Sequence, residues 1–150
     1  MIKKPKVVFD TQILLRAAIN RKSICAKIIF DLADHYDIIF SEETRHEIED
    51  VLSRPALRNK FSQLTDAVVD TVLKIFDDAQ EVQSYEVAEP ISRDPKDDKF
   101  LICAVAGQVQ YLVSEDKDIL VLNPYEDIAI VDALYFLEVL RSLGDETAED

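Results

Sequence analysis

The segment RDPKDDKFLICAVAGQVQYLVSEDKDIL, residues 93–120, decides the fold that we predict for this chain. An acid-rich turn opens an almost wholly apolar helix, and one short strand later the chain reaches a second acid-rich turn. Carboxylates crowded at the edges of buried elements are costly unless a cation or protons offset their charge. Two such clusters held by one rigid helix–strand unit therefore predict a site for a divalent metal ion.

The composition favours a single globular domain, because the chain has 150 residues of which 48% are hydrophobic. We place this domain at residues 1–143, followed by a polar C-terminal tail at 144–150. No apolar run approaches the ~18 residues that a membrane span needs. The N-terminal sequence MIKKPKVVFD contains no signal-type apolar stretch. We therefore expect a cytoplasmic protein with no membrane partner.

Scarce residue types exclude several kinds of site. The chain has two glycines, whereas a P-loop or a Rossmann phosphate turn needs several close together. Its two histidines and two cysteines form no zinc motif, and we expect Cys25 and Cys103 to be buried free thiols. A metal ion would then be held by oxygen atoms, which favours Mg²⁺ or Mn²⁺ over Zn²⁺.

The net charge of −13 is unevenly distributed along the chain. Residues 1–60 carry a net charge of +2, and residues 61–150 carry −15. A strongly acidic protein is normally a poor binder of nucleic acid. The basic N-terminal part, which includes Arg16, Arg54 and Arg58, still offers contacts for phosphate groups, so a phosphodiester substrate is not excluded.

Strand and helix patterns alternate along the chain, which predicts an α/β fold with three layers (α/β/α) and a mainly parallel central sheet. Short buried strands are predicted at residues 6–10, 36–40, 111–114 and 128–131, with a weaker extended segment at 81–87. Helices are predicted at residues 11–20, 23–33, 41–52, 65–80 and 94–107, and a last one after residue 132.

Carboxylates from separate elements are predicted to meet at the carboxyl edge of this sheet, where ligands bind in open α/β folds. Asp10 ends the first strand and Asp116 follows the strand at 111–114. Capping of the next helix is an equally good interpretation of Asp10. Among the acids of the helix at 41–52, Glu47 lies nearest to the apolar stripe, so it can flank a buried surface.

The helix at 94–107 begins with three acids that have different predicted roles. Asp94 suits an N-cap, and Asp97 suits the first turn, where a negative charge is favourable. Asp98 shares a face with Leu101 and Ile102, so it should point toward the core. A buried carboxylate needs a partner, and we therefore predict Asp98 as a metal ligand.

Such a cluster suits one or two Mg²⁺ or Mn²⁺ ions and the hydrolysis of a phosphodiester. No side-chain nucleophile with a suitable base is evident in the sequence. A phosphatase of the haloacid dehalogenase type would resemble Asp-x-Asp after the first strand, but position 12 is glutamine. A receiver domain normally pairs two acids there, and this chain has only Asp10.

Four blocks in this order resemble the PIN-domain family, in its branch of toxins from toxin–antitoxin systems: VVFDTQIL at 7–14, SEETRHEIEDVLSRP at 41–55, DPKDDKFLICAVAGQVQYLVSEDKDIL at 94–120 and DALYFLEVL at 132–140. The resemblance implies a Mg²⁺- or Mn²⁺-dependent endoribonuclease, with RNA as substrate, an antitoxin protein as partner and a homodimer. The implied catalytic and metal-binding residues are Asp10, Glu47, Asp98 and Asp116, with Asp118 as an auxiliary ligand. Substrate contacts are expected from Thr11, Gln12, Ser114, Arg16, Arg54 and Arg58.

The chain departs from the family pattern at two positions. Gln12 stands where the family usually has asparagine, and Glu115 stands where it often has glycine. Neither departure deletes a predicted ligand. Together with the net charge, they leave open an alternative, a PIN-like module that binds RNA or protein and has lost turnover.

Overall fold

The computed structural model describes residues 4–149, with side chains described up to Gly144. Five strands in this part of the chain form one sheet in the order β3-β2-β1-β4-β5, and every pairing is parallel. The strands are β1 (Lys6–Phe9), β2 (Asp37–Phe40), β3 (Gln80–Glu81), β4 (Tyr111–Val113) and β5 (Ala129–Val131). The predicted α/β fold with a parallel central sheet is confirmed.

The strand order reverses at the centre of the sheet, between β1 and β4. Chain order runs outward through β2 and β3 on one side of β1, and through β4 and β5 on the other. In open α/β sheets, ligands bind outside the carboxyl ends of the strands at this switch point. The residues that directly follow β1 and β4 therefore occupy the favoured position for a functional site.

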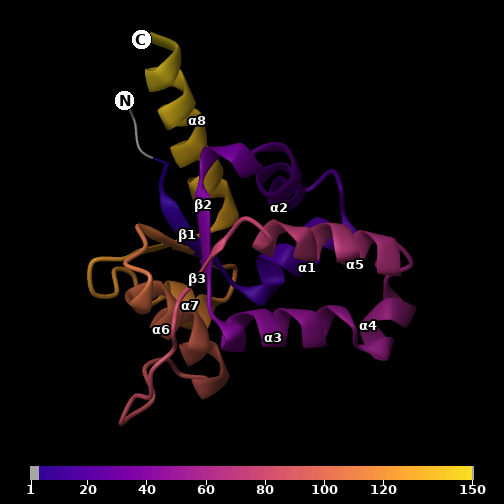
Figure 1. Ribbon diagram of the computed structural model, residues 1–150, viewed down its shortest axis with the longest axis horizontal. Coiled ribbons are helices and arrows are strands. Elements are labelled where there is room, and N and C mark those ends of the chain that lie inside the picture. Colours follow the sequence, from indigo (N-terminus) through magenta and orange to yellow (C-terminus); the bar gives the residue numbers. More distant parts are fainter. Residues whose placement is uncertain (1–3, 150) are drawn as a thin grey trace.

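Helices connect the strands and cover the sheet (Figure 1). Those between β1 and β2 are α1 (Thr11–Ile19), α2 (Ile24–Ala26), η1 (Lys27–Asp31) and η2 (Ala33–His35). Those between β2 and β3 are α3 (Glu42–Leu52), α4 (Pro55–Lys60), α5 (Asp66–Leu73) and η3 (Lys74–Phe76). The remaining ones are η4 (Pro95–Asp97), α6 (Asp98–Ala106), α7 (Lys117–Leu120) and α8 (Ala133–Glu149).

The end of the chain continues as helix beyond the predicted domain boundary. Helix α8 runs through residue 144 to Glu149, into the segment predicted as a polar tail, and residue 150 lies outside the described part. Among the described residues, no helix combines the length and the apolar character needed to cross a bilayer.

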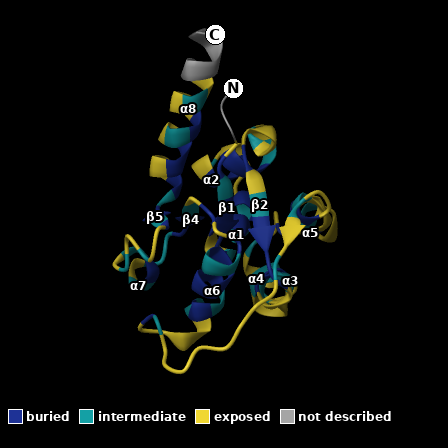
Figure 2. Cartoon of the chain, turned by 60° about the vertical axis from the view of Figure 1, so that its left-hand side comes forward, coloured by how far each residue is buried: buried dark blue, intermediate teal, exposed yellow. Residues whose placement is uncertain are grey.

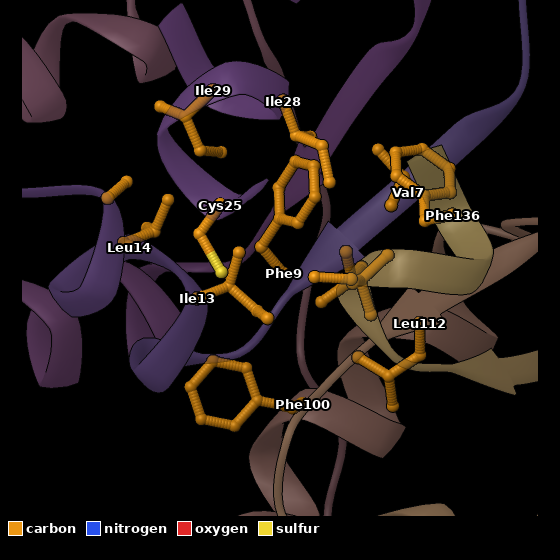
Figure 3. Packing of buried hydrophobic residues seen from close by; sticks show 14 of the residues in the cluster. Val7, Phe9, Ile13, Leu14, Cys25, Ile28, Ile29, Phe100, Leu112 and Phe136 are labelled. Atoms are coloured by element: carbon orange, nitrogen blue, oxygen red, sulfur yellow. The ribbon is translucent and has the colours of Figure 1, made fainter. Parts of the chain in front are cut away.

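The core packs against both faces of the sheet. Helix α6 contacts β1, β2 and β4, and its Phe100 is almost fully buried. Phe136 of α8 forms ring contacts with Phe9 and Tyr111, at centroid distances of 5.9 and 5.6 Å. Figure 3 shows Phe100 and Phe136 approaching the strands from different sides. The predicted buried free thiols, Cys25 and Cys103, are confirmed.

Helix α3 is fixed at the end of β2 by a capping box. The Ser41 hydroxyl accepts a hydrogen bond from the Thr44 amide at 3.3 Å, and the Thr44 hydroxyl accepts one from the Ser41 amide at 2.9 Å. This reciprocal arrangement satisfies two amides at the start of the helix. It directs α3 along α1 and α6, with which it packs, and this places Glu47 between them.

The segment between β3 and η4 is long and exposed, as the yellow loop at the bottom of Figure 2 shows. Its residues 83–90 are all exposed, including the apolar side chains of Tyr85 and Val87. The segment returns to the protein body at Ser92, which is buried. The anchoring of this return determines how the acids of η4 and α6 are presented.

Gly107 follows α6 and is required there by lack of space. Its φ of −85° is open to any residue, but a Cβ atom would collide with the buried side chain of Ile39 on β2. We expect Gly107→Ala to lower the free energy of unfolding by ~1–3 kcal/mol, because overpacking strains a well-packed core. Urea denaturation measures this change.

Gly144→Ala is the matched control for this prediction. Nothing lies within 4 Å of a Cβ atom at Gly144, which is inside α8. Alanine is the better helix former, so this variant should be neutral or gain up to ~1 kcal/mol. Equal effects of the two substitutions would contradict the proposed close approach of α6 to β2.

Candidate active site

Asp10 lies at the switch point of the sheet and is buried, with 3% of its surface exposed. Its Oδ1 accepts a hydrogen bond from the Ile13 amide at 3.2 Å and so caps α1, while its Oδ2 accepts one from the hydroxyl of the fully buried Ser114. The capping role and the position at the strand end thus occur together. Burial raises the pKa of Asp10 to about 6, although the hydrogen bonds from Ser114 and Ile13 act in the opposite direction.

Asp116 reaches the same position from β4. Its backbone amide donates to the Ser114 hydroxyl at 3.0 Å, and its Oδ1 accepts from the Asp118 amide at 2.9 Å, which caps α7. The charge of Asp116 also contributes to the raised pKa of Asp10. Ser114 therefore connects the two acids that follow the adjacent strands β1 and β4.

Asp97, and not Asp98, is the acid of the third element that faces this pair. Its Oδ2 is buried and has no hydrogen-bond partner within the described residues. Burial, the neighbouring charge of Asp116 and a hydrogen bond that the protonated Asp97 carboxyl makes with Asp116 raise the pKa of Asp97 to about 7, and the charges of Asp94 and Asp10 add to the effect. The sequence pattern missed Asp97 because it lies in the 3₁₀ turn η4, outside the regular period of α6.

Asp98 is buried as predicted, but its carboxylate is engaged with the returning loop. Oδ2 accepts from the Ile91 amide at 2.9 Å, and Oδ1 accepts from the Ser92 amide at 2.8 Å and lies 2.7 Å from the Ser92 hydroxyl, whose proton is shared with the Asp94 carbonyl at 2.6 Å. Burial raises the pKa of Asp98, but these three hydrogen bonds outweigh it, and the net pKa is lowered. The Asp98 carboxylate anchors residues 91–92 in this structure, and its role as a metal ligand stays a prediction.

Glu47 lies between the start of α1 and the start of α6. Its Oε2 accepts from the Thr11 hydroxyl at 2.7 Å, and its Oε1 is 3.0 Å from the Lys99 ammonium. Thr11 directly follows Asp10, and Lys99 stands two residues after Asp97. Glu47 is thus tied to two segments of the site through a hydroxyl and an ammonium group.

The predicted substrate-binding arginines occupy different surroundings. Arg54 pairs with Asp50 at 3.0 Å, and Arg58 pairs with Asp66 at 2.6 Å and donates to the Leu52 carbonyl. Arg58 thus links α3, α4 and α5, whereas the exposed Arg54–Asp50 pair only joins α3 to the start of α4. Arg16 of α1 is exposed and lines a surface pocket of about 230 Å³.

The two positions that depart from the family pattern differ in their surroundings. Glu115 accepts a hydrogen bond from the Ala133 amide at 3.2 Å, so it caps the start of α8 and lines the pocket next to Arg16. Gln12 is exposed in the first turn of α1. Neither side chain lies between Asp10 and Ser114, which are in direct contact.

The carboxylate oxygens of the site suit a hard divalent cation chemically, but they are not spaced as in a preformed metal site. Within the described residues, no group of three or more His, Cys, Asp and Glu side chains forms a preformed metal site. Asp10, Asp97 and Asp116 nevertheless interact electrostatically, and the buried Oδ2 of Asp97 lacks a partner. An unpaired buried carboxylate oxygen beside like charges is suited to Mg²⁺ or Mn²⁺, which take oxygen ligands.

The sequence profile described as PIN domain matches residues 6–118 of the chain, a range that contains Asp10, Asp97 and Asp116. The chain belongs to the PIN-domain family. PIN domains are generally nucleases. No curated protein sequence gives a significant match to this PIN-domain protein.

Two solved structures share the fold of this PIN domain. PAE2754 from Pyrobaculum aerophilum is 17% identical, with a TM-score of 0.56 over 93% of this chain and 91% of that chain. The second structure is VapBC2 from Rickettsia felis bound to a DNA fragment from the VapBC2 promoter. The matched chain is 12% identical, with a TM-score of 0.55 over 85% of this chain and 98% of that chain. At these identities the similarity concerns the fold alone.

Proposed function

We propose that this PIN-domain protein is a Mg²⁺- or Mn²⁺-dependent endoribonuclease and the toxin of a toxin–antitoxin pair. The observation that carries the proposal is the buried Oδ2 of Asp97, which accepts no hydrogen bond from a donor group within the described residues. The charges of Asp116 and Asp10 act on the same carboxyl group. When bound, the metal ion would supply Lewis-acid activation of water and of the scissile phosphodiester.

Three carboxylates would hold the ion: Asp10, Asp97 and Asp116. Ser114 would keep two of them in position, since its hydroxyl donates to Asp10 and accepts from the Asp116 amide. Asp10 and Asp116 also cap helices, which restricts their side-chain rotamers. Ligands that are oriented by a second layer of hydrogen bonds and mounted on rigid elements are the ones that bind metals precisely. Asp118 remains the proposed auxiliary ligand.

The RNA substrate and the partners rest on the family resemblance. Arg16 is the best-placed phosphate contact, because its guanidinium is exposed and the described residues give it no ion pair. Gln12 is exposed beside the site, while Thr11 and Ser114 already make hydrogen bonds to acids. From the family resemblance we propose an antitoxin protein as partner, together with a homodimer in the cytoplasm.

The proposal is tested by incubating labelled RNA with the protein and Mg²⁺ or Mn²⁺, and comparing wild type with Asp10→Asn. Asparagine is a good N-cap, so this variant should keep α1 and its fold. We expect cleavage by the wild type, none in a chelator, and at least ~100-fold slower cleavage by the variant.

The control is Asp50→Asn, which removes an exposed acid of α3 that pairs with Arg54. It should cleave RNA like the wild type. Equal cleavage by wild type and Asp10→Asn would indicate a contaminating nuclease and overturn the proposal.

A module without turnover is the second candidate, and one observation favours it. No preformed group of three metal-binding side chains occurs within residues 4–144, where side chains are described. Such a module would bind RNA or a protein partner, and Mn²⁺ would give no binding heat in calorimetry. Mn²⁺ binding by the wild type, reduced in Asp10→Asn, would decide for the nuclease.

A further inference from the structure

We infer that Lys99 is a tethered cation that takes the place of a second divalent ion beside Glu47, so that the site accepts one metal ion. The inference rests on the proposed metal-dependent function and specifies the charge balance of its site. It concerns two residues that face each other from α3 and α6, and it starts from the contacts that Glu47 already makes.

Both carboxylate oxygens of Glu47 are engaged. Oε1 lies 3.0 Å from the Lys99 ammonium, and Oε2 accepts the Thr11 hydroxyl at 2.7 Å. Only 23% of the Glu47 side chain and 31% of the Lys99 side chain are exposed, so water screens this pair incompletely. A divalent ion that used Glu47 as a ligand would lie beside the Lys99 ammonium, whose positive charge disfavours a second cation there.

The position of Lys99 at the start of α6 indicates that its ammonium is stabilised by the carboxylate of Glu47. Lys99 is the second residue of α6, in the first helical turn. A positive charge at that end is disfavoured by the helix dipole, and acids are preferred. The nearby carboxylate offsets this cost. Asp98 and Phe100, which flank Lys99 in the chain, are buried, so the backbone that carries Lys99 is held in place.

The Lys99 ammonium lowers the negative charge that metal ions must offset at this site. Asp10, Asp97, Asp116 and Glu47 carry four negative charges when all are ionised. One divalent ion and the Lys99 ammonium offset three of these charges, whereas without Lys99 one divalent ion offsets only two. An ammonium group is a compact point charge, so it replaces a cation at this position better than a delocalised group would.

The number of bound ions is the test, and it is independent of activity. Mn²⁺ is titrated into the whole protein by calorimetry, and bound ions are counted by electron paramagnetic resonance. We expect one Mn²⁺ per chain for wild type, for Lys99→Arg and for Glu47→Gln. We expect two for Lys99→Met, because the ammonium that disfavours a second cation at Glu47 is then absent, and one again for the double variant Lys99→Met/Glu47→Gln.

Two results would overturn the inference while leaving the nuclease proposal intact. One is a wild type that cleaves RNA and binds two ions, and the other is a folded Lys99→Met that still binds one. Loss of the single wild-type ion in Glu47→Gln would also overturn it, because Glu47 would then be a ligand already. Lys99→Gln replaces Lys99→Met if circular dichroism shows that the latter is unfolded. A wild type that neither binds Mn²⁺ nor cleaves RNA would remove the proposed function itself.

Discussion

Replacing Asp97 by asparagine is expected to abolish RNA cleavage, with a loss of at least ~100-fold, in a protein that keeps its fold. Asp97 carries the buried oxygen that has no partner within the described residues, and Asp116 lies close enough to raise its pKa. Asparagine has nearly the same shape but removes one negative charge from the proposed ligand set, and lost ligands or their supports weaken metal sites strongly. Initial rates of cleavage in Mn²⁺ measure the effect.

Asp94→Asn is the matched control, because Asp94 is exposed and its Oδ1 caps η4 by accepting from the Lys96 amide at 3.1 Å. Asparagine also caps well, so activity should stay within ~2–3-fold of wild type. Full activity in Asp97→Asn, or an equal loss in Asp94→Asn, would show that Asp97 is not the third ligand.

The same variant should change how the stability of the metal-free protein depends on pH. The pKa values of Asp97 and Asp10 are raised from 3.8 to about 7 and about 6, so between these pH values and pH 4 the native state binds more protons than the unfolded state. The free energy of unfolding then falls as pH rises through this range and levels off above it. Urea denaturation in a chelator should show a smaller decline for Asp97→Asn.

Acids at strand ends could be predicted from the sequence because strand ends follow from the apolar runs. Parallel strands bring their carboxyl ends to one edge, so Asp10 and Asp116 were expected together, and both are linked through Ser114. The period of a helix could not show that Asp97 faces Asp116 while Asp98 faces residues 91–92. This difference depends on the turn η4 and on the path of residues 91–92, which fill the position facing Asp98.

Contacts between distant segments were also beyond the sequence pattern. Glu47 was selected by its helix face, but the pattern gives no sign of Lys99 or Thr11 as its partners. Arg58 shows why a basic cluster is a weak signal, since its partner Asp66 comes from the next helix. An acidic side chain close in space can neutralise a basic residue that the sequence alone suggests is free to bind phosphate.

Replacing Asp98 by alanine is expected to lower the free energy of unfolding by about 3 kcal/mol. The substitution removes the acceptor of two amide hydrogen bonds and of a share in the Ser92 hydroxyl proton, which also faces the Asp94 carbonyl, at a residue that is 6% exposed. Hydrogen bonds to a charged group contribute ~1.5–3 kcal/mol each, but the freed loop can reach water, so the total should stay below their sum. Urea denaturation at pH 7 measures it.

The pKa of Asp98 gives this prediction a second, pH-dependent test. Because that pKa is lowered in the folded protein, the contribution of the carboxylate is present above the ordinary value of 3.8 and is lost as pH falls through the folded pKa. The difference in stability between wild type and Asp98→Ala should therefore shrink in acid. Ser92→Ala is the control, because it leaves the two amide hydrogen bonds to Asp98 and removes only the hydroxyl shared between Asp98 and the Asp94 carbonyl, which should cost ~1 kcal/mol.

Metal binding separates the structural role of Asp98 from the role that the sequence predicts for it. Below its own unfolding temperature, Asp98→Ala should still bind Mn²⁺, because the proposed ligands are Asp10, Asp97 and Asp116, although the loosened loop can weaken the affinity several-fold. A variant as stable as wild type that no longer binds Mn²⁺ would reverse the assignment. Asp98 would then be the ligand, and the hydrogen bonds to Ile91 and Ser92 would have to be exchanged for the ion when it binds.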